Sequence, residues 1–133
     1  MDKIDYRLLI ETLNKYGVEA LRIFDKLHSE DLIAKSYIIQ YGSYARFERV
    51  EWDESDENNI CIRYYNYHYD SYDSSTLDIP ASILFNDEKI DNWIQGLITA
   101  ALKKIEESNR KIELKNEERE RLEYERLKAK FEK

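Results

Sequence analysis

ICIRYYNYHY, residues 60–69, is rich in β-branched and aromatic residues, which pack well on a half-buried strand. Tyr37–Trp52 has the same character, and Thr76–Ile79 makes a shorter run of the same kind. Polar stretches rich in Asp, Asn and Ser, which favour turns, separate these runs. The pattern predicts a small antiparallel sheet of three or four strands over about residues 37–79, with a bend or bulge at Gly42.

The first part of the chain has an apolar period of three to four residues, which is typical of amphipathic helices. Gly17 stands where it would end the first helix, and Ser29 is a good N-cap for a third. We therefore expect a helical head over about residues 3–36, made of three helices at 3–16, 18–28 and Glu30–Lys35.

A long helix is predicted after Pro80, which ends the sheet. Asn86 is a good N-cap, and the two acidic residues after it favour a helix start. No proline follows as far as Phe131. The first part of this helix has a broad apolar face, so we expect it to cover the sheet with Trp93, Ile94, Leu97 and Ile98.

The predicted fold class is α+β, with a helical head, a small sheet and a long C-terminal helix. Three glycines and one proline in 133 residues argue against a β-sandwich with many tight turns. We expect a single domain over residues 1–112, in which the helix starts at 87, and a charged extension of that helix over 113–133.

The net charge of −7 is concentrated in the middle of the chain, where residues 51–102 hold 11 acidic and 2 basic residues. Such a field repels phosphate and attracts basic surfaces, so we expect no direct binding to nucleic acid. The single cysteine cannot form an internal disulfide, and no apolar run resembles a secretory signal or a membrane span. We expect a cytoplasmic protein.

Residue patterns for catalysis or metal binding are weak. Cys61 lies between two isoleucines and is expected to be a small buried side chain, with only His28 and His68 as bases. An EF-hand loop over residues 53–64 would need Gly at its sixth position and Glu at its twelfth, where this chain has Asn and Tyr. We predict no enzyme activity, no metal site and no cofactor.

Tyrosine is the residue type that stands out, because eight of the eleven lie between Tyr37 and Tyr72. Within Tyr64–Tyr69 they occupy both strand parities, so they cannot all face one core. Tyrosines beside carboxylates would suit a docking face for a basic protein, although β-propensity and acidic, soluble loops explain the same composition. The predicted partner-binding residues are Glu51, Asp53, Glu54, Asp56, Glu57, Tyr64, Tyr65, Tyr67, Tyr69, Asp70, Tyr72 and Asp73.

DIPASILFNDE, residues 78–88, and EYERLKAKFE, residues 123–132, resemble segments of small bacteriophage and prophage proteins. These proteins have a tyrosine-rich hairpin region, a Pro-x-x-x-Leu-Phe step and a long charged helix, and the resemblance covers residues 60–133. It implies a phage origin and action inside a bacterial host cell. The group has no assigned activity, so no residue role carries over, and inhibition of host defence, as by anti-CRISPR proteins, is an analogy.

The predicted function is a non-enzymatic, phage-encoded inhibitor that binds a host protein. Its acidic, tyrosine-rich surface would occupy a basic nucleic-acid-binding site, for instance on a CRISPR or other defence nuclease. One alternative is an oligomeric structural or assembly protein that forms a homodimer through the C-terminal helix. Another is a small DNA-binding regulator in which residues 18–27 read DNA, although the charges of that segment cancel.

Overall fold

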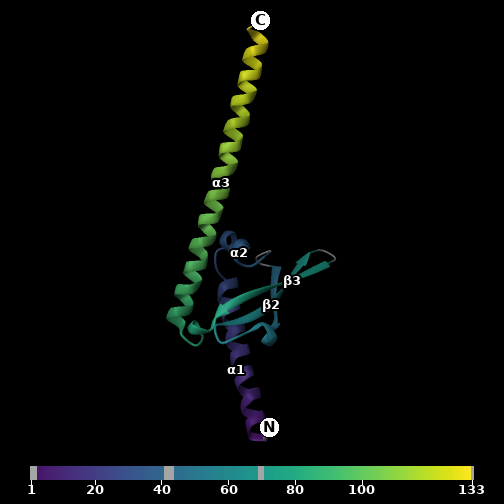
Figure 1. Cartoon of the computed structure of the whole chain (residues 1–133), viewed down its shortest axis with the longest axis vertical. Coiled ribbons are helices and arrows are strands. Elements are labelled where there is room, and N and C mark those ends of the chain that lie inside the picture. The colour runs from purple at the N-terminus through teal and green to yellow at the C-terminus, as the bar shows by residue number, and fades with distance from the viewer. Residues whose placement is uncertain (1–2, 41–43, 69–70, 133) are drawn as a thin grey trace. The chain divides into compact units, whose positions relative to one another are not determined.

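The structure is a computed structural model that describes residues 3–40, 44–68 and 71–132. It has the predicted α+β class, with an N-terminal helix, a three-stranded antiparallel sheet and a long C-terminal helix (Figure 1). The elements in chain order are α1 (Lys3–His28), α2 (Leu32–Ile38), β1 (Ala45–Val50), η2 (Trp52–Glu54), β2 (Asn59–His68), β3 (Ser71–Pro80), η3 (Ala81–Ile83) and α3 (Asp87–Phe131).

α1 is one continuous helix, so the predicted break at Gly17 is wrong. The apolar spacing runs through the glycine, from Leu13 on one side to Ala20 and Phe24 on the other. Burial of the second half of the helix outweighs the roughly 1 kcal/mol that an interior glycine costs relative to alanine.

α2 corresponds to the third predicted helix, but it spans Leu32–Ile38 and not Glu30–Lys35. Asp31, not Ser29, is its N-cap, because the Asp31 carboxylate accepts hydrogen bonds from Ile33 N and Ala34 N at 2.8 and 3.1 Å. Ser29 instead ends α1, where its hydroxyl donates to the Lys26 carbonyl at 2.8 Å. Among the residues described before the sheet there are thus two α-helices, where three were predicted.

The strand predicted to start at Tyr37 starts at Ala45 instead, because Tyr37 and Ile38 belong to α2. Local β-propensity there is overridden by helix capping and by the burial of Ala34 and Ile39. Tyr41 and Gly42 lie outside the described residues. The register shift falls inside β1, between Phe47 and Arg49.

The sheet has the order β1-β2-β3, and both pairings are antiparallel. β2 and β3 pair along ten residues each, from Asn59 opposite Pro80 to His68 opposite Ser71. β3 is therefore longer than the predicted Thr76–Ile79, because pairing with β2 extends it through the polar residues before Thr76.

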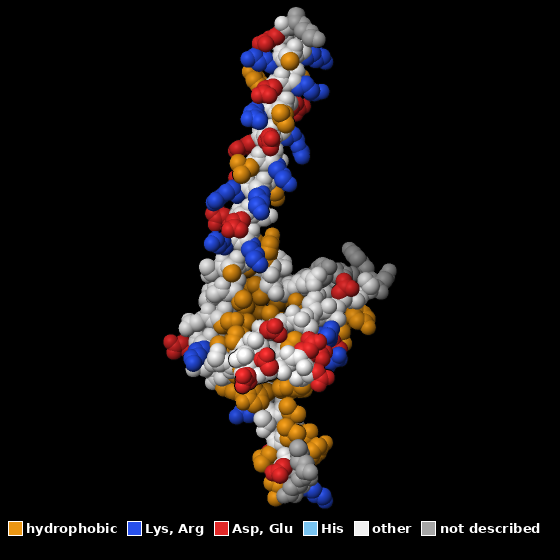
Figure 2. Space-filling view, in the orientation of Figure 1, with side chains coloured by type: hydrophobic (Ala, Val, Ile, Leu, Met, Phe, Trp, Pro, Cys, Tyr) orange, Lys and Arg blue, Asp and Glu red, His pale blue; other side chains and the backbone are white. Residues whose placement is uncertain are grey.

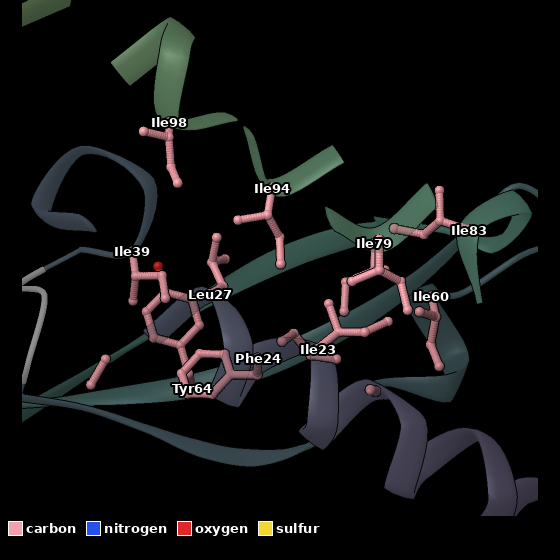
Figure 3. Close-up of a cluster of buried hydrophobic side chains, with 14 of the residues drawn as sticks. Ile23, Phe24, Leu27, Ile39, Ile60, Tyr64, Ile79, Ile83, Ile94 and Ile98 are labelled. Atoms are coloured by element: carbon pink, nitrogen blue, oxygen red, sulfur yellow. The ribbon is translucent and has the colours of Figure 1, made fainter. Parts of the chain in front are cut away.

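The hydrophobic core joins one face of the sheet to the second half of α1 and the first turns of α3 (Figure 3). Ile60, Ile62 and Tyr64 of β2 belong to this core, and the Phe24 and Tyr64 rings lie 5.7 Å apart. Of the four α3 residues expected to cover the sheet, Ile94 and Ile98 are buried, whereas Trp93 and Leu97 pack on the core only partly buried.

The junction before α3 is fixed to α1 by a charged network. Glu19 is buried and bonds Arg22, with Nε and Oε1 2.7 Å apart, and Arg22 also bonds Asp87 at 2.7 Å. The Phe85 N–H donates to Glu19, and Phe85 adopts a left-handed φ of 63°. Asn86 then caps α3 by accepting from Lys89 N at 3.1 Å, as predicted.

α3 spans Asp87–Phe131, as predicted, but it belongs to two compact units, one up to Ala101 and one from Leu102. Ala101 is its last buried residue, and every described residue after Ser108 is exposed. In the described part of the chain, no helix combines the length and the apolar character that crossing a bilayer needs.

Candidate functional site

The two faces of β2 have different roles. Ile62 and Tyr64 point into the core, and the Tyr64 hydroxyl accepts a hydrogen bond from Gln40 N at 3.1 Å. Tyr64 is only 3% exposed, so it is a core residue and is removed from the predicted docking face. Arg63, Tyr65 and Tyr67 have the opposite parity and belong to the outer face of the sheet.

Three tyrosines gather on that outer face at the end where β2 turns into β3. We call Tyr65, Tyr67 and Tyr72 the tyrosine cluster. Tyr67 and Tyr72 are register partners, and the Tyr65 ring meets the Tyr72 ring edge-on with centroids 5.4 Å apart. Tyr67 is 53% exposed and Tyr72 65% exposed, so the cluster presents aromatic surface to solvent.

An arginine–glutamate network continues the outer face beside the cluster. Glu51 accepts hydrogen bonds from Arg49 Nε at 2.9 Å and from Arg63 Nε at 2.6 Å. The hydrogen bond from Arg63 is the main reason why the pKa of Glu51 lies below its usual range. Glu51 is thus neutralised by two arginines and does not act as a free acidic group.

Four predicted acids lie together at the opposite end of β2. We call Asp53, Glu54, Asp56 and Glu57 the acidic loop; all four are exposed. Asp56 shapes the loop, because its carboxylate accepts from Asn58 N at 2.8 Å and from Asn59 N at 2.9 Å. Within the described residues no ion pair neutralises any of the four, so the loop carries an uncompensated charge.

The structure does not bring the predicted docking residues into one patch. The acidic loop ends just before Asn59, whereas Tyr67 lies near the far end of β2. Tyr67 lies eight positions along the extended strand from Asn59, a distance of about 26 Å. Asp73 is exposed and lies on β3 near the tyrosine cluster, and Tyr69 and Asp70 lie outside the described residues.

Cys61 is buried, as predicted, and its surroundings make it a poor nucleophile. Burial raises the pKa of its thiol to about 11, and hydrogen bonds and charge from Asp78 and Glu54 act in the same direction. The sulfur lies 3.7 Å from Glu54 Oε2. A thiol with so high a pKa is almost wholly protonated at neutral pH, which leaves little thiolate for chemistry.

In the described ranges, no three His, Cys, Asp or Glu side chains come together in a way that could hold a metal ion. Comparison with family models, with curated proteins and with solved structures gives no match.

Sequence reasoning missed an apolar groove between α1 and the β1 side of the sheet. It has a volume of about 520 Å³ and is lined from the helix by residues that include Ile10, Gly17 and Leu21, and from the other side by Phe47 and Trp52. The signal was present, because the apolar spacing of α1 continues unbroken through Gly17. The prediction that a helix ends at Gly17 divided this continuous apolar stripe in two, so the groove was not recognised.

Proposed function

We propose that the protein is a non-enzymatic binding protein that inhibits its partner by docking on it through the tyrosine cluster. The observation that carries the proposal is the pair of exposed rings, Tyr67 and Tyr72, held side by side on paired strands and braced by Tyr65. Tyrosines fixed in this way offer large contact area at low entropic cost, as binding hot spots do.

The acidic loop has a different role in this proposal. Its four uncompensated carboxylates attract a basic surface from a distance and raise the rate of encounter, which is what exposed charges at an interface do. Because about 26 Å of strand separates the loop from the tyrosine cluster, the two surfaces engage different parts of the partner.

The proposed partner is a host protein whose basic surface binds nucleic acid. A negatively charged chain that occupies such a surface competes with phosphate, so inhibition follows from binding alone. The resemblance to phage proteins extends the proposal to counter-defence in a bacterial cytoplasm, with a CRISPR or other defence nuclease as the partner.

Dimerisation through α3, the alternative function, has less support. The positions that would continue its apolar seam beyond Ile112 include Lys115, Arg119 and Arg126, and all three are exposed. Cations at seam positions oppose helix pairing.

The experiment is affinity capture from bacterial lysate followed by binding kinetics on the captured protein. Tyr67→Ala should speed dissociation at least tenfold, because a hot-spot ring contributes 2 kcal/mol or more. Tyr124→Ala is the matched control, since Tyr124 is as exposed as Tyr72 but lies on α3. Equal dissociation rates for Tyr67→Ala and wild type would contradict the proposal.

The acidic loop is tested with amides of the same shape, in Asp53→Asn, Glu54→Gln, Asp56→Asn and Glu57→Gln together. Association should slow and lose most of its salt dependence, because steering by exposed charge is screened by salt. Glu117, Glu118, Glu120 and Glu123 on α3, changed to Gln, alter the net charge by the same amount and should have less effect. If the loop variant associates as fast as wild type at both low and high ionic strength, the acidic loop does not attract the partner electrostatically.

A further inference from the structure

The apolar stripe of α1 is covered along only half of its length. Ile23 and Leu27 in the second half are fully buried, whereas Tyr6, Leu9 and Ile10 in the first half are 59%, 43% and 40% exposed. Figure 2 shows hydrophobic side chains gathered over this N-terminal part of α1. A helix stripe of this width normally packs against something.

The groove beside α1 adds to this exposed surface. Val18, Leu21 and Trp52 line it and are 68%, 39% and 41% exposed. The exposed apolar side chains on the groove side, Tyr6, Ile10, Val18, Leu21 and Trp52, offer roughly 500 Å² at about 100 Å² each. That is within the ~300–600 Å² range of the largest apolar patch on a typical monomer, and such patches often serve as interaction sites.

Gly17 points to close approach by another chain. An interior helix glycine costs about 1 kcal/mol relative to alanine, yet a Cβ added at Gly17 meets no atom of this chain within 4 Å. The packing of the chain itself therefore does not require the glycine. Gly17 lines the groove, where a missing side chain lets a second backbone come near.

The charges along the groove side of α1 identify the occupant. Lys3 and Arg7 lie at one end and Asp25 at the other, and Asn14 is midway between Lys3 and Asp25. All four are exposed, and no ion pair engages the three charged residues among the residues that the structure describes. Asp5 and Glu11 also lie in the first half of α1, and Lys26 and His28 lie in its last turn. The complementarity is therefore local: Lys3 and Arg7 on this side of one copy suit Asp25 of an antiparallel copy.

We propose that the protein forms a two-fold symmetric homodimer in which the first half of each α1 lies antiparallel in the groove of the other copy. The axis passes near Asn14, so that Lys3 and Arg7 of one copy come opposite Asp25 of its partner. A two-fold interface uses the same patch on both copies, and this apolar, charge-paired groove meets that condition. The inference does not rest on the tyrosine cluster or on the proposed inhibition.

The test is the oligomeric state of the full chain by sedimentation velocity over a range of concentrations. Wild type should be a dimer at micromolar concentration, and Val18→Asp should raise the dimer dissociation constant at least 100-fold with an unchanged helical signal in circular dichroism. Ile112→Asp is the matched control, because Ile112 is 54% exposed on α3, and it should leave the dimer intact. A monomeric wild type, or a dimer lost in Ile112→Asp and kept in Val18→Asp, would overturn the proposal.

Two further sets of variants test the geometry. Gly17→Ala should raise the thermal midpoint of the Val18→Asp monomer while weakening the otherwise wild-type dimer about tenfold. Lys3→Glu with Arg7→Glu should also weaken the dimer, and adding Asp25→Arg should restore it. An equally tight dimer in Gly17→Ala, or no restoration by Asp25→Arg, would contradict the antiparallel arrangement.

Discussion

The first half of α1 and the last part of α3 are both exposed helix, but their surfaces are chemically opposite. Residues 4–10 of α1 hold five large apolar side chains that are each at least 40% exposed. α3 beyond Ile112 is mostly Glu, Lys and Arg, with apolar residues scattered singly. Water satisfies the second surface and not the first, so of these two helical surfaces only that of α1 is suited to an interface.

α3 is stabilised in a way that needs no partner. Glu106 and Arg110 are four residues apart, with Arg110 Nη2 3.3 Å from Glu106 Oε1. Lys128 and Glu132 form a second pair of the same spacing at 3.9 Å. Such pairs support a solvated helix by a few tenths of a kcal/mol each, and neither pair involves another chain. Exposure alone therefore does not identify an interface; the kinds of side chain on the exposed surface do.

The largest expected effect separates the two halves of α1. Ile23→Ala should lower the free energy of unfolding by about 2–5 kcal/mol, because Ile23 is fully buried and leaves a cavity. Leu9→Ala should change it by less than about 0.5 kcal/mol, because Leu9 is 43% exposed in the monomer. Both free energies of unfolding are measured by urea denaturation in the monomeric Val18→Asp background. Equal decreases for the two substitutions would contradict the difference between the two halves of α1.

The next effect concerns the charged network that joins α1 to α3. Glu19→Gln should lower the free energy of unfolding by about 1–3 kcal/mol, since a buried acceptor loses its charge-assisted bonds to Arg22. Those bonds are the largest cause that holds the pKa of Glu19 below its usual range.

The sign of the pH dependence follows from that lowered pKa. The stabilisation by Glu19 is fully present above the pKa of an unfolded Glu, about 4.3, and is lost as pH falls through the lower folded value. Between pH 7 and pH 3, the free energy of unfolding should fall more steeply in wild type than in Glu19→Gln. Parallel curves would show that the network does not contribute.

A smaller effect is expected from the last part of α3. Deleting Glu113–Lys133 should move the thermal midpoint by no more than about 2 °C and should leave the dimer intact, because exposed ion pairs add little. A collapse to monomer on deletion would show that α3, and not α1, holds the two copies together.

The smallest effect is that of a single ion pair on α3. Glu106→Gln should cost about 0.2–0.5 kcal/mol, because the pair is exposed and salt screens it. The difference should vanish in 1 M salt, as measured by thermal denaturation of both proteins. A loss that persists at high salt would mean that Glu106 has another role.

Parts of the fold with a strong local signal were predictable from the sequence. The start of α3 follows from Asn86, which caps the helix, and its length follows from the absence of proline. Gly17 and Tyr37 were misjudged because glycine and β-propensity are weak local preferences that tertiary burial overrides.

The candidate site was harder to predict, because closeness in sequence does not mean closeness in space. The acidic loop and the tyrosine cluster are neighbours along the chain, yet extended strand carries them to opposite ends of β2. Alternation along β2 placed Tyr64 in the core and Tyr65 outside, and the sequence does not reveal which parity is buried when both are tyrosine.

Hydrogen exchange tests the contrast between the two exposed helices most directly, by comparing amide protection in dilute and concentrated protein. Amides of residues 4–16 in α1 should become strongly protected at the higher concentration, because a second copy covers them. Amides of residues 113–131 in α3 should exchange rapidly at both concentrations. Protection that rises in α3, or that stays unchanged in α1, would show that α1 is not the dimer interface.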